Sequence, residues 1–497
     1  MPQEILAARN ISKAFGGVQA LQDVSLTLNA GEIRCLVGEN GSGKSTLIKI
    51  LAGAERPDTG AIVVGGKTFP HLEPIEAIRA GIQVIYQDFA LFPNLTVAEN
   101  LALNTELERG SFLVNWRRVR RTATEALARL GRDIDLKAEV GELPLADRQL
   151  VAISRALLHN ARVIIMDEPT TALTQREVDT LFRLLADLKG RGVSLLFVSH
   201  KLREVLEISD AITVLRNGRN VAEGPAAQFS HSDLVHHMTG RQFQQHSTEA
   251  APGAGAGALH VASLSRRGAF ADVGFEVRAG EIVGMAGLRG SGRTELALAL
   301  FGLAPADSGQ IRIHGQVTRI QNVPAALRAG IAYVPEDRLT EGVFAEQSIA
   351  KNVAVSSMGT LASRIGWIRF GPLRALVGRW MEDLRIQASS VDTPVGRLSG
   401  GNQQKVVLGR WLATEAKVLI LHGPTVGVDI GAKVDVHEKI RDLAGQGMAV
   451  LLITDDLPEL VELCHRILIM HRGRIVKELP AARCNEDGLA AELSALP

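Results

Sequence analysis

The stretch GENGSGKST (38–46) follows the apolar run IRCLV and precedes LIKILAG, which is expected to be helical. It fits the pattern G-x-x-x-x-G-K-[ST] of a phosphate-binding loop, in the strand–loop–helix context that this pattern requires. Glycines at 41 and 43 let backbone N–H groups close around phosphates. Lys44 is expected to reach the β- and γ-phosphate oxygens, and Ser45 to offer its hydroxyl to Mg²⁺. The alternative is a chance glycine-rich turn, which these flanks disfavour.

Polar side chains stand at three further expected strand ends. In VIIMDEPT (163–170), Asp167 is placed to hold Mg²⁺ and Glu168 to orient or deprotonate the attacking water. The alternative is a helix N-cap pair. Gln87 ends GIQVIYQ and His200 ends SLLFVSH; each is weak alone, but together they match what an α/β nucleotide site needs.

The chain is a duplication. AGEIRCLVGENGSGKST (30–46) superposes on AGEIVGMAGLRGSGRTE (279–295) at an offset of 249. LPLADRQLVAISRAL (143–157) superposes on LSGGNQQKVVLGRWL (398–412) at an offset of 255. Two domains are predicted, joined by a flexible Gly/Ala-rich linker. The expected bounds are 1–240, 241–258 for the linker, and 259–497.

Continuous apolar strands such as VIIMD and SLLFVS are typical of parallel sheets covered on both faces, so each half is predicted to be an α/β domain with a mainly parallel sheet and a helical stretch. The formal net charge of +1 gives no field for nucleic acid. Three cysteines without C-x-x-C spacing fit a reducing compartment. No apolar run approaches the ~18 residues of a membrane span. We expect a cytosolic protein, or one held at a membrane by a partner.

The signature LSGGNQQ (398–404), together with the loop, Gln87, MDEPT and His200 in that order, resembles ABC-transporter ATPases over nearly the whole chain. More narrowly, the chain resembles the two-cassette ATP-binding subunits of bacterial monosaccharide importers of the ribose, galactose and xylose type. The segments that carry this resemblance are Gly-Arg-Thr (292–294), VPEDR (334–338), LSGGNQQK (398–405) and GVDIGAK (427–433). LADRQ (145–149) resembles the subgroup that imports the autoinducer-2 furanose or polyols.

The resemblance implies tandem P-loop NTPase domains packed head to tail, with ATP and Mg²⁺ as ligands. It also implies a transmembrane permease, in two copies, and an extracytoplasmic solute-binding protein as partners, with no nucleic acid. The place would be peripheral, on the cytoplasmic face of the inner membrane. The docking surface would include Phe89, Leu91, Phe92 and Leu95; the alternative is that these four are core residues.

In such a pair, nucleotide lies between the phosphate loop of one cassette and the signature of the other. A serine and two glycines at a helix N-terminus suit a γ-phosphate. Phe15 is a candidate to stack on adenine, or else a core residue. The catalytic candidates are Lys44, Gln87, Glu168 and His200, and the metal candidates are Ser45, Gln87 and Asp167. The ATP-binding candidates are Phe15, Gly38, Glu39, Asn40, Gly41, Ser42, Gly43, Lys44, Ser45, Thr46, Leu398, Ser399, Gly400, Gly401, Asn402 and Gln403.

The second composite site departs from this pattern repeatedly. Its candidate residues are Gly287, Gly290, Ser291, Gly292, Arg293, Thr294, Glu336, His422, Gly423 and Asp455. Arginine replaces the loop lysine, and neither strand-end carboxylate is present. The signature that it would receive, LPLAD (143–147), puts a proline and bulkier side chains where serine and glycines stand in the other half. By the resemblance, Arg293, Glu336 and the absence of a histidine at Asp455 are typical of a second cassette. His422 and Gly423 instead depart from the Asp-Glu pair that is usual there. We therefore hypothesise one hydrolytic site and one binding or regulatory site.

The sequence disfavours two rival functions. A soluble twin-cassette ATPase acting on ribosomes or nucleic acid usually has a long charged linker and basic tails. Here the linker is short and the tail AARCNEDGLAAELSALP (481–497) is acidic. A P-loop kinase is disfavoured by the duplication and the signature.

Overall fold

The structure is a computed structural model in which the chain forms two compact units, Met1–Phe243 and Gln244–Pro497. The described residues are 3–86, 88–108, 114–128, 134–158, 160–171, 173, 175–199, 201–240, 257–361 and 368–496. The first strand of the second unit, β11 (Gly257–Arg266), begins inside the expected linker, so residues 257 and 258 belong to a strand.

The first unit is built on a six-stranded sheet in the order β10-β9-β3-β8-β7-β6. All neighbouring pairs are parallel except β9 with β10. The strands are β3 (Ile33–Val37), β6 (Ile82–Ile85), β7 (Val163–Asp167), β8 (Ser194–Val198), β9 (Ala211–Arg216) and β10 (Arg219–Pro225). Every residue of β3 and β8 is buried, as expected for central strands covered on both faces. The predicted parallel α/β core is confirmed.

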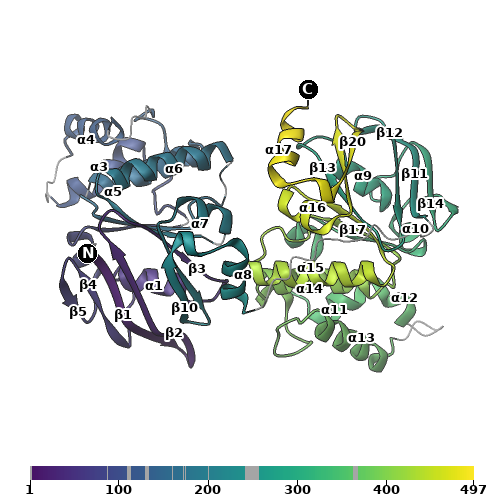
Figure 1. Ribbon diagram of the computed structural model, residues 1–497, viewed down its shortest axis with the longest axis horizontal. Coiled ribbons are helices and arrows are strands. Elements are labelled where there is room, and N and C mark those ends of the chain that lie inside the picture. The colour runs from purple at the N-terminus through teal and green to yellow at the C-terminus, as the bar shows by residue number, and fades with distance from the viewer. Residues whose placement is uncertain are drawn as a thin grey trace. The chain divides into compact units, whose positions relative to one another are not determined.

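An antiparallel four-stranded sheet and a group of helices complete this unit. The sheet has the order β2-β1-β4-β5, from β1 (Glu4–Phe15), β2 (Val18–Asn29), β4 (Thr59–Val64) and β5 (Lys67–Phe69). Helices α3, α4 and α5 lie on the other side of the unit from this sheet (Figure 1). They share a core of buried residues that includes Leu101, Val119 and Val151. The helices are α1 (Lys44–Leu51), α2 (Pro74–Arg79), α3 (Val97–Glu108), α4 (Trp116–Ala128), α5 (Leu145–Leu158), α6 (Gln175–Gly190), α7 (Leu202–Ile208) and α8 (His231–Thr239).

The second unit repeats the same topology. Its sheets have the orders β12-β11-β14-β15 and β16-β17-β18-β13-β19-β20. The other strands are β12 (Phe270–Arg278), β13 (Ile282–Ala286), β14 (Ser308–Ile313), β15 (Gln316–Thr318), β16 (Ile331–Val334), β17 (Val418–His422), β18 (Ala449–Ile453), β19 (Arg466–His471) and β20 (Arg474–Pro480). The α-helices are α9 (Arg293–Leu300), α10 (Val323–Arg328), α11 (Ile349–Ala354), α12 (Met358–Leu361), α13 (Phe370–Asp383), α14 (Gly400–Leu412), α15 (Ile430–Gly445), α16 (Leu457–Leu463) and α17 (Glu486–Ser494). The chain is thus a duplication in structure as well as in sequence.

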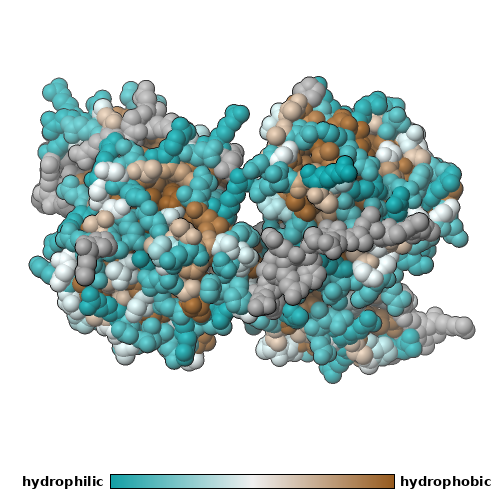
Figure 2. Space-filling view, viewed as in Figure 1, coloured by the Kyte–Doolittle hydropathy of each residue, from teal (hydrophilic) through white to brown (hydrophobic). Residues whose placement is uncertain are grey.

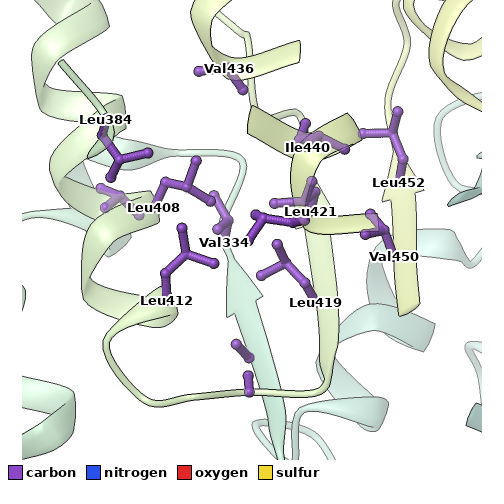
Figure 3. Close-up of a cluster of buried hydrophobic side chains, with 14 of the residues drawn as sticks. Val334, Leu384, Leu408, Leu412, Leu419, Leu421, Val436, Ile440, Val450 and Leu452 are labelled. Carbon is purple, nitrogen blue, oxygen red and sulfur yellow. The ribbon is translucent and has the colours of Figure 1, made fainter. Parts of the chain in front are cut away.

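The two faces of β17 lie in two separate cores. Leu419 and Leu421 join the cluster that contains residues of α14 and α15, whereas Val418 and Ile420 join the cluster of α9 and the antiparallel sheet. Figure 3 shows side chains of β16, β17 and β18 turned toward those of α14 and α15. This packing fixes the strand ends, and the polar residues that follow them, relative to the helices.

The visible face of each unit carries mainly hydrophilic residues, with smaller hydrophobic groups between them (Figure 2). Within the described ranges, no helix combines the length and the apolar character that crossing a membrane requires.

Candidate active site

The two phosphate loops have the same backbone shape. Gly41 and Gly43 have φ values of 80° and 102°, and Gly290 and Gly292 have 79° and 100°. A Cβ on Gly43 would lie 2.6 Å from the carbonyl oxygen of Ala20, so that position has no room for a side chain. The loops end where α1 and α9 begin, which directs free N–H groups of a helix start toward the place of a phosphate.

Lys44 is held against its own loop. Its side chain is buried, and Nζ donates hydrogen bonds to the carbonyl oxygens of Gly38 at 2.8 Å and Glu39 at 2.9 Å. The positive charge therefore lies at the loop that closes around phosphates. Ser45 follows Lys44 at the first turn of α1.

Asp167 and Glu168 stand at the carboxyl end of β7, two strands from β3. Burial and the neighbouring charge of Glu168 raise the pKa of Asp167, while Lys44 opposes the shift. A cation beside this carboxylate would remove that penalty, and a carboxylate with a hydroxyl is a donor set that suits Mg²⁺. The residues present therefore fit a magnesium ion held by Asp167 and Ser45.

Glu168 adopts a strained backbone. Its φ is 48°, in the left-handed region that costs a non-glycine residue about 1–2 kcal/mol. Its N–H donates to the carbonyl oxygen of Val198 at 2.9 Å, which ties this turn to the end of β8. Strain of this kind persists where surrounding structure imposes it, as at functional sites.

Two of the predicted catalytic residues, Gln87 and His200, lie outside the described residues. Phe15 is 45% exposed at the end of β1, with Lys13 Nζ 5.1 Å from its ring centroid. The alternative that Phe15 is a core residue is therefore wrong.

The four candidate docking residues differ in how far their side chains are exposed. Phe89 is buried, Phe92 is exposed, and Leu91 and Leu95 are partly buried. Of the four, only Phe92 offers a largely free side chain to a partner.

The signature of the second unit forms a capped helix start. Ser399 is the N-cap of α14, and its hydroxyl accepts hydrogen bonds from the backbone N–H of Asn402 at 3.4 Å and its side-chain amide at 2.9 Å. In the first unit α5 starts at Leu145, after Pro144, and the proline ring carries no hydrogen-bonding group that could cap the helix. The two signatures thus differ in chemistry at the same point of the same fold.

Arg293 in the second loop forms an ion pair with an acid of its own unit. It is buried, its guanidinium pairs with the carboxylate of Asp455, and it also donates to the carbonyl oxygen of Thr454 at 3.2 Å. An unpaired carboxylate at Asp455 would repel a phosphate bound at this loop. The pairing shows that its charge is met by the arginine that replaces the loop lysine.

His422 and Glu336 form the second such pair. His422 is almost fully buried, with Nε2 3.2 Å from a carboxylate oxygen of Glu336 and Nδ1 3.3 Å from the hydroxyl oxygen of Tyr333. Burial lowers the pKa of His422, helped by Arg293 and opposed by Glu336 and Asp455. The imidazole is therefore mainly neutral at pH 7, and it supplies no anionic oxygen to a metal.

Restoring the missing acids by His422→Asp with Gly423→Glu is expected to leave steady-state ATP turnover within about twofold of wild type. Gly423 has a φ of 56°, and a Cβ there would lie 2.9 Å from a methyl group of Val426, so the new Glu would be strained and crowded. The first-half signature, LPLAD, would also be unchanged. Gly423→Ala is the control for the strain alone. Turnover that rises twofold or more would show that the missing acids alone keep the second site inactive.

Sequence reasoning missed two residues of this region. The sequence pattern gives no role to Tyr333, and Arg338 enters only within VPEDR (334–338), a segment that carries the resemblance. The one available signal for Arg338 was the duplication, because the matching segment of the first half, residues 88–92, contains no arginine.

The chain is similar to known proteins over nearly its whole length. A family model described as "ABC transporter" matches residues 21–171 and 270–426. The chain is 42% identical over 490 residues to "Ribose import ATP-binding protein RbsA 2" of Streptomyces avermitilis, covering 99% of this chain and 97% of the relative. It is 40% identical over 486 residues to "Putative ribose/galactose/methyl galactoside import ATP-binding protein 3" of Agrobacterium fabrum, covering 98% and 97%. A solved nucleotide-free ATP-binding cassette from an ABC transporter is 32% identical and covers 45% of this chain and 92% of its own, with a TM-score of 0.41.

Proposed function

The chain belongs to the ABC transporter family, and on that premise we propose that it is the ATP-hydrolysing subunit that energises import of a monosaccharide or related small polyhydroxy solute through a membrane permease. The full-length similarity to proteins named for ribose import supports the solute class. None of the relatives reported above is named for ribosomes or nucleic acid, so the alternative is not favoured. The place of action is the cytoplasmic face of the membrane, where the permease would hold the chain.

The observation that carries the proposal is the way intact elements are distributed. The first unit has the lysine loop and the acid pair, and the second has the serine-glycine signature. One complete site results if the loop of Lys44 receives the signature of Ser399. The other combination joins an arginine loop to a proline-containing signature. We propose one hydrolytic site and one site that binds or regulates.

In the hydrolytic site each residue has a separate task. Lys44 and the loop N–H groups would bind the β- and γ-phosphates. Asp167 and Ser45, with Gln87 as a further candidate, would hold Mg²⁺, which would neutralise phosphate charge. Glu168 would orient the attacking water and accept its proton, and His200 remains a further catalytic candidate. In this proposal, Ser399 with the N–H groups that follow it would close the far side of that phosphate.

The permease would dock at a cavity of the second unit. This cavity, of about 460 Å³, is lined by residues of α9, α10, β16 and α14 and of the turns beside them; its lining residues are Leu298, Phe301, Leu303, Val323, Tyr333, Pro335, Glu341 and Trp411. Leu303 is exposed there, and Tyr333 joins the cavity to His422 and so to the second site. A helix with apolar side chains suits this lining.

Co-purification with a polytopic membrane protein, followed by a sugar screen on the associated binding protein, tests the function. We expect Leu303→Glu to lower the amount of permease recovered several-fold. The matched control is Val317→Glu, because Val317 is also an exposed apolar residue but does not line the cavity. This substitution should leave the recovery of permease unchanged. Recovery of ribosomes in place of a membrane protein would contradict the proposal.

A further inference from the structure

Arg338 joins three segments of the second unit that are far apart in sequence. Its guanidinium donates hydrogen bonds to the carbonyl oxygens of Val426 at 2.7 Å and Gly427 at 3.1 Å. Nε lies 3.4 Å from the side-chain oxygen of Gln403 in α14. The residue therefore connects the turn after β16, the loop after β17 and the helix that carries the signature.

The segment that contains Arg338 is itself fixed. It forms a π-helical turn, η3 (Arg338–Gly342), capped by Asp337, whose carboxylate accepts hydrogen bonds from the N–H groups of Leu339 at 2.9 Å and Thr340 at 3.1 Å. π-Helical turns are rare and frequently occur at functional sites. Burial lowers the pKa of Arg338, against the charge of Asp337, but an arginine shifted from so high a value keeps its charge at pH 7.

The guanidinium lies directly against the first glycine of the signature. A Cβ on Gly400 would lie 2.6 Å from Nη2 of Arg338 and 3.1 Å from the carbonyl oxygen of Gly427. A Cβ on Gly401 would lie 2.4 Å from the Cβ of Ala432 at the start of α15. The backbone after Ser399 is thus confined on two sides, by Arg338 and by α15.

The two halves differ at both positions together. Arg338 lies where the offset between the halves changes, between Asp337, which matches Asp88, and Phe344, which matches Phe92; residues 88–92 of the first unit contain no arginine. At the offset of 255, Gly400 corresponds to Leu145. Where the signature has a glycine, an arginine lies against it; where the signature has a leucine, the arginine is absent. The arginine is therefore associated with the intact signature and not with the fold that both units share.

We propose that Arg338 is a positioning residue for ATP hydrolysis, holding the backbone N–H groups of Gly400 and Gly401 in the direction that a γ-phosphate requires. The inference rests on the proposed function, in which this signature completes the site of Lys44. The two hydrogen bonds to Val426 and Gly427 hold the guanidinium in place against Gly400, in a way that a single flexible ammonium would not. A positive charge beside the helix N-terminus also favours an anion there.

Arg338→Ala is expected to lower kcat at least about tenfold while the Kd of a fluorescent ATP analogue at the first loop stays within about twofold. Arg338→Lys should lose an intermediate amount, and it keeps the test interpretable if the alanine variant folds poorly. The matched control is Arg148→Ala. Arg148 also donates to backbone carbonyls at the base of a signature helix, that of Leu143 included, but in the first unit.

A double-mutant cycle with Ser399→Ala separates positioning from simple stabilisation. Because both residues act through the same helix start, the double variant should be little slower than the slower single variant. Independent effects that multiply, or a kcat of Arg338→Ala within twofold of wild type, would overturn the inference. An equal loss in Arg148→Ala would also overturn it. If Ser399→Arg is inactive while Arg338→Ala is fully active, only this inference fails; if Ser399→Arg is active, the proposed site itself fails.

Discussion

Replacing Glu168 with glutamine is expected to lower the rate of ATP turnover at least about 100-fold, a rise of about 2.7 kcal/mol in the barrier, while ATP stays bound. Glutamine keeps the size of the side chain but accepts no proton from the attacking water. The binding groups of the first loop, Lys44 among them, are untouched. Phosphate release measures the turnover, and the Kd of a fluorescent ATP analogue measures the binding.

The control for this substitution is Glu336→Gln. It removes an acid at the corresponding edge of the second sheet, whose carboxylate contacts His422 and not a phosphate loop. We expect turnover close to wild type in this control. If Glu168→Gln keeps more than about a tenth of wild-type kcat, roughly 1.4 kcal/mol in the barrier, the idea of a single hydrolytic site is refuted.

Ser399→Arg is expected to be as damaging, although it lies in the other unit. The arginine removes the N-cap hydroxyl of α14 and places a long side chain where the γ-phosphate would lie. Loss of the cap alone costs about 1 kcal/mol of stability, so the thermal midpoint should move by only a few degrees. Turnover should nevertheless fall about 100-fold.

Pro144→Arg is the matched substitution in the first unit, at the start of α5. The account predicts little change in turnover, because this signature does not serve the hydrolytic site. Unchanged hydrolysis in Ser399→Arg, or equal losses in the two variants, would contradict the assignment of signatures to sites.

Much of the fold and of the first site could be predicted from sequence because their signals are local. The phosphate loop depends on glycines within nine residues, and the parallel sheet depends on short apolar runs such as β7 and β8. The strand-end acids Asp167 and Glu168 follow from the same runs. The left-handed backbone of Glu168 could not be predicted, because it accompanies a hydrogen bond to Val198 on the neighbouring strand, a contact between residues far apart in the sequence.

The pairs of the second site could not be predicted, because they depend on which strands are neighbours. Arg293 and Asp455 are 162 positions apart in the sequence, and they meet because β13 lies beside β18. His422 meets Tyr333 because β16 and β17 are parallel neighbours. Sequence alone showed that Arg293, His422 and Asp455 were unusual, and the structure shows that each is paired within its own unit.

The central claim is that the nucleotide held by Lys44 is closed by the signature at Ser399. Photolabelling of Glu168→Gln with an ATP analogue that carries an aryl azide on its γ-phosphate tests it most directly. The account predicts label on a peptide that contains residues 398–404, and loss of that label in the presence of excess ATP. Label confined to residues 1–240 would contradict it.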